Sequence, residues 1–282
     1  MRLIAKFLTL VLLGMGGVWQ AASASPASDL HAFQAYFFTR FPGVKPAQFS
    51  DGEWIPGVAS PNDLAQYQSI MAFPPQSFEV QKGKQLFNAA FPDGGHYADC
   101  FPNGGIGISQ TYPRFNSQTG QVITLAMTLN QCRVKHHLKP LAYKRGALAD
   151  ILAYMASSSK GKPIDIKIPN TPKALEAYSM GKNFFYTQIG ALNLSCADCH
   201  MIHSGQRLRG QLISPALGMV AGFPVYRAKW GGLGTIDRRF IGCNKKIRAR
   251  PFKPQSVQYR DLQYFLAYMS NGLPMKGPGY RN

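Results

Sequence analysis

Two segments of the chain carry the hydrophobic periodicity of an amphipathic helix and end in the same four residues. Residues 143–155 and 259–269 both finish in Leu-Ala-Tyr-Met, at an offset of 114 positions. Within each segment, apolar residues recur at the i, i+3, i+4, i+7 spacing that places them on one face of a helix. Each pattern therefore predicts a helix whose apolar face contributes to a core.

A second match lies upstream of each of these helices. Residues 83–87 (Gly-Lys-Gln-Leu-Phe) correspond to residues 181–185 (Gly-Lys-Asn-Phe-Phe) at an offset of 98. Each half of the chain thus opens and closes with a helix, which indicates an internal repeat. We predict a mainly α fold with two similar domains at 75–160 and 170–282, joined by a linker that contains Ser, Gly and Pro.

Glycine and proline shape the expectation for the rest of the chain. The sequence holds 28 Gly and 20 Pro among 282 residues, which favours short elements joined by long irregular loops. Residues 25–74 contain six prolines, too many for one long helix. We expect this segment to be an irregular wrap around the two domains.

The centre of the second half contains the sequence Cys196-Ala-Asp-Cys199-His200. Cys-x-x-Cys-His is the attachment motif of a c-type haem, because two thiols bind the vinyl groups and the adjacent histidine binds the iron. A zinc site completed by His203 and Cys243 is the alternative. The adjoining histidine and the bracketing helices favour haem c and therefore cytochrome-c-like domains.

The corresponding positions of the first half read Tyr97-Ala-Asp-Cys100-Phe101, at an offset of 99. Tyr97 and Phe101 replace the first attachment cysteine and the axial histidine. The first domain is therefore predicted to be degenerate and haem-free. We expect one covalently bound haem c per chain.

The haem of the second half needs a second axial ligand, and Cys243 is the candidate. It lies 43 residues after His200 and shortly before the helix that begins near residue 255. Three methionines are weaker alternatives. Met219 comes too early in the chain, Met269 belongs to the apolar stripe of the last helix, and Met275 follows that helix. Cys243 as a buried free thiol also stays open.

The first residues of the chain have the composition of a secretory signal peptide. A basic start with Arg2 and Lys6 precedes an apolar stretch at 7–18 and a small-residue cleavage signal at 22–24. A membrane anchor is the alternative, but the apolar stretch is shorter than the ~20 residues of a spanning helix. We predict removal of residues 1–24, a periplasmic location and no membrane span after processing.

The mature chain would be strongly basic. Its 29 Lys and Arg residues exceed 13 Asp and Glu residues, which gives a net charge of +16. Basic proteins attract anionic partners. Because the predicted location lies outside the cytoplasm, we expect no nucleic-acid partner.

The motifs together resemble those of a known family. An exported chain with two such halves, Cys-Ala-Asp-Cys-His in the second and Arg-Phe-Ile-Gly-Cys at 239–243, is similar to the SoxA family, the A subunits of the sulfur-oxidising (Sox) cytochromes. The likeness covers nearly the whole mature chain. Its specificity rests on residues 239–243 and the degenerate first half, which resembles the single-haem branch.

This resemblance implies an enzyme, L-cysteine S-thiosulfotransferase. In the family the A subunit pairs with a small monohaem cytochrome subunit, SoxX. The complex oxidatively joins thiosulfate to a cysteine on the flexible arm of a sulfur-carrier protein and passes electrons to a partner cytochrome. A simple periplasmic electron-transfer cytochrome c is the alternative function.

The resemblance also implies residue roles. Cys196 and Cys199 would be the covalent haem links, His200 the proximal ligand and Cys243 the distal ligand, described in the family as a persulfide and part of the active site. Arg239 would contact the substrate. Six Lys or Arg residues lie between 238 and 250, and guanidinium groups suit oxyanions and lower a thiol pKa. A solvated charged loop is the alternative for this run.

The repeat also predicts a disulfide between Cys100 and Cys132. Cys100 corresponds to Cys199, and Cys132 corresponds to Cys243 at an offset of 111. Both cysteines therefore flank a lost haem position, where collapse of the pocket would let the thiols meet in an oxidising compartment. Two separate buried thiols are the alternative. The neighbouring His136 and His137 are expected to be surface residues.

Overall fold

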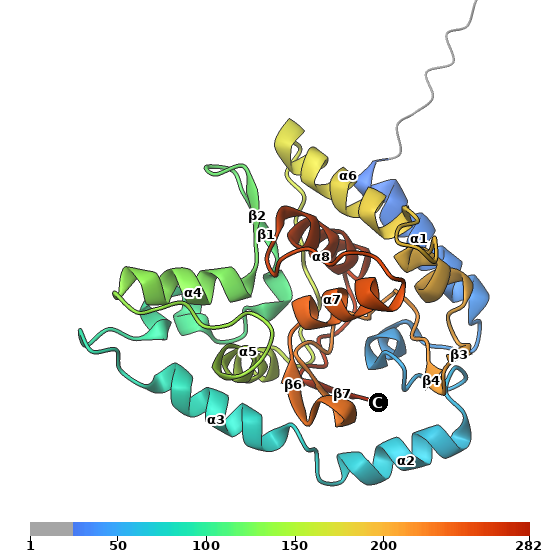
Figure 1. Cartoon of the computed structure of the whole chain (residues 1–282), viewed down its shortest axis with the longest axis horizontal. Helices are drawn as coiled ribbons and strands as arrows, with labels where there is room; N and C mark the ends of the chain where they lie inside the picture. Colours follow the sequence, from blue (N-terminus) through green and yellow to red (C-terminus); the bar gives the residue numbers. More distant parts are fainter. Residues whose placement is uncertain (1–24) are drawn as a thin grey trace, which may run out of the picture.

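The computed structural model describes residues 25–282 and is mainly helical (Figure 1). The predicted signal peptide, residues 1–24, lies outside the described residues. The helices are α1 (Pro26–Arg40), α2 (Pro61–Met71), α3 (Ser77–Asn88), α4 (Leu125–Lys135), α5 (Ala147–Ser157), α6 (Pro172–Tyr186), α7 (Ile236–Lys246) and α8 (Val257–Met269). The strands are β1 (Arg114–Asn116), β2 (Gln121–Ile123), β3 (Arg207–Leu208), β4 (Gln211–Leu212), β5 (Val225–Arg227), β6 (Gly232–Gly234) and β7 (Gly279–Arg281).

The predicted helical repeat is present. Helix α3 packs on α5 in the first half, and α6 packs on α8 in the second. Residues 83–87 lie in α3 and residues 181–185 lie in α6. Helix α5 starts at Ala147, later than residue 143 where the matched segment begins, because Gly146 has a positive φ of 76°.

Short sheets fill the space between the helices. Strands β1 and β2 form an antiparallel hairpin, as do β3 and β4. In the three-stranded sheet, β5 pairs antiparallel with β6 and parallel with β7, so the end of the described chain lies beside the segment that precedes α7. This sheet fixes β5 and β6 immediately before the helix that carries Cys243.

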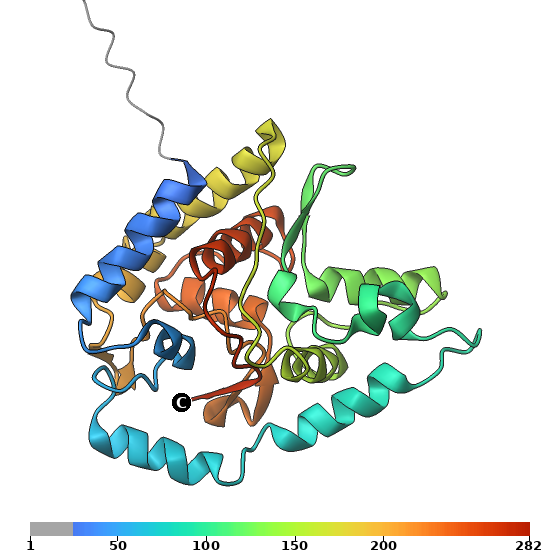
Figure 2. The same ribbon diagram turned by 180° about the vertical axis from the view of Figure 1, so that it is seen from behind.

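The expectation of an irregular segment at 25–74 is wrong, because α1 and α2 lie within it. Both helices begin with a proline, Pro26 or Pro61, and each follows a serine cap, Ser25 or Ser60. Proline is well tolerated in the first helical turn, where its missing N–H has no partner to lose. Helix α1 lies along α6, and α2 and α3 run along the edge of the molecule (Figures 1 and 2).

The described residues form two large hydrophobic clusters. One belongs to the first half and extends from Phe87 to Met155. The other joins the second half to the N-terminal segment, because Phe33, Phe37 and Phe49 pack into it. Among residues 25–282, no helix combines the length and the apolar composition needed to cross a membrane.

Candidate active site

A cavity of about 490 Å³ lies in the second half of the molecule, between α6, α7, α8 and the segment 187–213. Its wall contains all five residues that the sequence predicted for the haem and the substrate: Cys196, Cys199, His200, Arg239 and Cys243. Such a volume is typical of sites for cofactors and small ligands. The tertiary structure thus brings the two predicted motifs together.

A local turn fixes the Cys-x-x-Cys-His segment. The Ser195 hydroxyl accepts a hydrogen bond from the Asp198 N–H at 3.0 Å, and the Asp198 carboxylate accepts one from the Ser195 N–H at 2.8 Å. This reciprocal cap begins the turn. The chain continues as a π-helical turn over Asp198–Ile202, a form often found at functional sites.

The imidazole of His200 is oriented by the backbone. Its Nδ1 lies 2.8 Å from the carbonyl oxygen of Ser214. A carbonyl oxygen can only accept, so Nδ1 donates this bond, and Nε2 is the ring nitrogen that remains to contact Cys243 or a ligand. His200 is only 9% exposed and lines the cavity. This is the arrangement expected of an axial histidine ligand, whose second nitrogen is held by a hydrogen bond.

Helix α7 presents Cys243 together with two cations. Arg239 lies four residues before Cys243 and Lys246 three residues after it, so the three side chains share one face of the helix. Burial opposes ionisation of the thiol, but Arg239 and a hydrogen bond with His200 outweigh it and lower the pKa of Cys243 to about 6. Cys243 is thus poised as a thiolate that faces His200.

The attachment thiols have the opposite character. Burial, followed by the nearby Cys243, raises the pKa of Cys196 to about 12, and burial also raises the pKa of Cys199. These two thiols are therefore protonated and lie against an apolar wall. That wall consists of Phe184, Phe185, Leu192, Leu194, Phe240, Leu262 and Leu266.

This donor set fits a haem c. Two thiols lie at the apolar wall, the Nε2 of an imidazole is not used by the backbone, and the sulfur of Cys243 faces that imidazole from α7. Met219 also lines the cavity, whereas Met269 and Met275 do not. Among residues 25–282, Cys196, Cys199 and His203 do not belong to a cluster with metal-site spacing, so the geometry gives the zinc alternative no support.

Only some of the cations that line the cavity belong to the basic run at 238–250 that the sequence analysis identified. Of the six cations between 238 and 250, Arg239 and Lys246 line the cavity. Arg238 instead stacks on Trp230, with its guanidinium carbon 4.2 Å from the ring centroid. The run also forms helix α7 over most of its length, so the alternative of a charged loop is wrong there.

Three further cations of the cavity wall come from other segments: Arg209, Arg227 and Lys229. Burial, together with the neighbouring Arg239, lowers the pKa of Arg227 to about 10. Burial, together with Arg227, lowers the pKa of Lys229 to about 8. These residues could not be predicted from the sequence, because they are scattered along the chain and no motif links them to Cys243.

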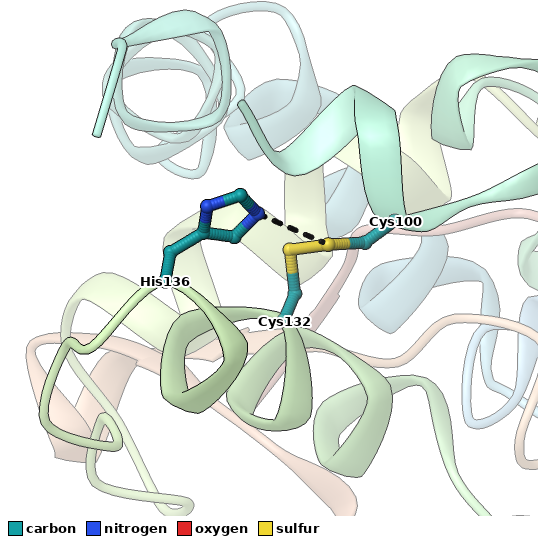
Figure 3. Close-up of side chains that lie close together, drawn as sticks. All are labelled: Cys100, Cys132 and His136. Carbon is teal, nitrogen blue, oxygen red and sulfur yellow. Dashed lines mark hydrogen bonds between the residues drawn. A yellow bond between two sulfur atoms is a disulfide. The ribbon is translucent and has the colours of Figure 1, made fainter. Parts of the chain in front are cut away.

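The first half contains a disulfide where the second half has its haem motif. Cys100 and Cys132 are bonded, with their Cα atoms 5.8 Å apart, as the repeat predicted (Figure 3). Tyr97 and Phe101 are buried, and the ring of Tyr97 lies 5.8 Å from Phe87 and 4.8 Å from Phe91. Aromatic rings thus fill the part of the first half that corresponds to the haem motif of the second half.

The two adjacent histidines differ from each other. His137 is exposed, as expected. His136 is not a surface residue, because its side chain is only 14% exposed and its Nδ1 lies 2.7 Å from the carboxylate of Asp93. No local pattern in the sequence indicates this contact, since the two partners are 43 positions apart.

Comparisons with known proteins agree on one family. Residues 82–164 match the model of the SoxA/TsdA cytochrome c domain. The chain is 45% identical to the L-cysteine S-thiosulfotransferase subunit SoxA of Allochromatium vinosum, over 97% of this chain and 96% of that protein. It is also 45% identical to the subunit of the same name from Chlorobaculum thiosulfatiphilum, over 90% of this chain and 87% of that protein.

A solved structure shows the same similarity in three dimensions. The crystal structure of SoxXA from P. pantotrophus superposes on this chain with a TM-score of 0.70 and 28% sequence identity. The match covers 77% of this chain and 84% of the other. A cytochrome c domain within a mainly helical fold is therefore common to both.

Proposed function

Since the chain belongs to the SoxA family of L-cysteine S-thiosulfotransferase subunits, we propose that it is the haem c subunit of an enzyme that joins thiosulfate to a carrier-protein cysteine. One observation carries the proposal. Cys243, Arg239 and the Cys-x-x-Cys-His segment line a single cationic cavity. The predicted signal peptide supports a periplasmic location for this activity.

The reaction removes two electrons while it forms one S–S bond. Thiosulfate and the carrier thiol combine through the terminal thiosulfate sulfur and the cysteine sulfur, with loss of one proton and two electrons. The product is a cysteine S-thiosulfonate with one negative charge. A bound haem c would supply the electron acceptor that this balance requires, and a partner cytochrome similar to SoxX would receive the electrons.

The protein side chains attract and hold the anionic reactant. Thiosulfate carries two negative charges, and the cavity wall offers Arg209, Arg227, Lys229, Arg239 and Lys246. A guanidinium can hold the sulfonate oxygens by two parallel hydrogen bonds. Arg239 is the proposed substrate contact because it shares the face of α7 that carries Cys243. The remaining cations raise the local concentration of the anion.

Cys243 distinguishes this enzyme from a simple electron carrier. The cationic surroundings favour its thiolate, and a thiolate is the reactive form of a cysteine. We propose that Cys243 is the distal haem ligand and also the sulfur atom at which thiosulfate chemistry takes place. Cys196 and Cys199 would hold one haem, and His200 would be its proximal ligand.

Replacement of Cys243 by methionine tests the proposal. Cys243→Met leaves Cys196, Cys199 and His200 in place, so the haem content should equal that of the wild type. We expect coupling of thiosulfate to the carrier cysteine to be lost, because a thioether cannot form a thiolate. Coupling at the wild-type rate in Cys243→Met would reject the role of Cys243 and leave it as a ligand alone.

A further inference from the structure

The cavity of the second half accounts for three of the five cysteines, and the remaining two form a second site with its own polar groups. His136 Nε2 lies 3.9 Å from the sulfur of Cys100 (Figure 3). The ligand atoms of Cys100, Cys132 and His136 all lie within 4.8 Å of one another. The imidazole therefore faces the sulfur of Cys100, and the sulfur of Cys132 lies within 4.8 Å of a ring nitrogen.

The imidazole is held in this position from several sides. Asp93 Oδ2 lies 2.7 Å from His136 Nδ1, and this hydrogen bond keeps the pKa of Asp93 below its ordinary value. The Phe91 ring lies 4.8 Å from the imidazole, centroid to centroid. Gly95 packs so closely that a Cβ there would overlap with the ring. Asp93 thereby fixes the proton on Nδ1 and directs Nε2 towards the sulfur atoms.

A disulfide that serves only to close a loop needs no oriented histidine. A carboxylate that holds a histidine, whose free nitrogen faces a sulfur atom, is the arrangement that moves protons to and from a thiol. The two sulfur atoms also differ in access. Cys132 is 3% exposed, whereas Cys100 is partly exposed. An incoming thiol therefore reaches Cys100 first.

We propose that the Cys100–Cys132 disulfide is a redox-active pair that oxidises a dithiol, with His136 as its acid–base group and Asp93 as the positioning residue. His136 Nε2 takes the proton of the first incoming thiol, and the thiolate attacks Cys100. The Cys100–Cys132 bond breaks, and the Cys132 sulfur leaves with the electron pair and receives the proton from His136.

The second thiol of the same molecule completes the reaction. It attacks the mixed disulfide at the sulfur of the incoming molecule, and Cys100 leaves as a thiolate that takes up the second proton. The dithiol has then lost two electrons and become a disulfide. Cys100 and Cys132 have gained those electrons and are two thiols. Any small or protein-bound dithiol of suitable reach satisfies this balance.

The rate of disulfide opening in the full-length holoprotein tests this proposal. The probe is dithiothreitol, and the readout is alkylation of Cys100 and Cys132 followed by peptide mass analysis. We expect His136→Asn to slow opening by about tenfold or more, since acid–base assistance of this kind is worth at least that much. His137→Asn is the matched control, because His137 is the exposed neighbour, and it should open at the wild-type rate.

Two further measurements separate chemistry from packing. Asp93→Asn should slow opening, whereas Asp93→Glu should restore much of the rate, because only a carboxylate both holds Nδ1–H and stabilises the imidazolium with a negative charge. If His136→Asn fails to accumulate, the Asp93 pair carries the test alone. With a monothiol as the probe, the trapped mixed disulfide should lie on Cys100 and the alkyl group on Cys132. Equal rates in all variants, or a mixed disulfide on Cys132, would overturn the proposal.

Discussion

Gly181 packs directly against the backbone carbonyl of Asp261, so closely that a Cβ at this position would overlap with the oxygen. Gly83 has the same relationship to the carbonyl of Asp150. The two helix crossings therefore correspond, and Asp150 and Asp261 differ by 111 positions. Cys132 and the proposed ligand Cys243 differ by the same number. The shared Leu-Ala-Tyr-Met of α5 and α8 gives an offset of 114, whereas the two helix crossings give 111. The difference is 3 residues, about one helical turn.

Gly181→Ala should destabilise the protein by about 2 kcal/mol, because the added methyl forces α6 away from α8. Urea unfolding of the holoprotein measures the change. Gly242→Ala in α7 is the control, since a Cβ there meets nothing within 4 Å and alanine favours a helix. A Gly181→Ala protein as stable as Gly242→Ala would contradict the tight crossing.

Asp261→Asn should make stability less dependent on pH. Burial, only partly offset by Arg260, raises the pKa of Asp261 to about 7. The folded protein therefore holds a proton that the unfolded chain releases near pH 4, and this stabilisation is present at low pH and lost as the pH rises towards 7. The free energy of unfolding of the variant, relative to wild type, should rise by about 3 kcal/mol between pH 5 and pH 8.

A matched carboxylate checks this result. Asp165 is exposed and pairs with Lys167, so Asp165→Asn should keep the pH profile of the wild type. If the free energies of unfolding of Asp261→Asn and wild type changed equally from pH 5 to pH 8, the carboxyl of Asp261 would titrate normally in the folded protein.

One covalent haem per chain is expected, because Tyr97 and Phe101 occupy the haem-motif positions of the first half. The pyridine haemochrome assay counts the haem directly. Cys100→Ser should leave the count unchanged, whereas Cys196→Ser combined with Cys199→Ser should abolish covalent attachment. Two haems per chain would show that the first half also holds one.

Arg239→Ala should lower kcat/KM for thiosulfate by about 10- to 100-fold, the value of a hydrogen-bonded charge contact. The haem spectrum should change little, because the ligands stay in place. Lys245→Ala is the control on the same helix: Lys245 is exposed and lies outside the cavity. Equal losses in the two variants would point to a general effect of charge, which added salt would largely screen.

The disulfide should contribute about 4 kcal/mol to stability on the chain-entropy model, since its two cysteines are 32 positions apart. Replacement of Cys100 and Cys132 by serine in one double variant should lower the free energy of unfolding by this amount. Peptide mapping without reduction should recover the two cysteines in one linked pair. Recovery of both as free thiols would rule out the bond.

Local signals in the sequence determined the parts of this protein that depend on near neighbours. The apolar spacing marked α5 and α8, since helix periodicity is a local property. The Cys196-to-His200 motif indicated a haem, because the spacing of its thiols follows from the geometry of the cofactor. The comparison of the two halves paired Cys100 with Cys132, and the structure has that bond.

Only the tertiary structure decided which distant residues share a site. Arg227 and Lys229 join Arg239 at the cavity because the β5–β6 hairpin leads directly into α7. His136 faces the disulfide because the loop that carries Asp93 folds over the end of α4. These contacts depend on packing between elements far apart in the chain, and the sequence contains no local pattern that encodes them.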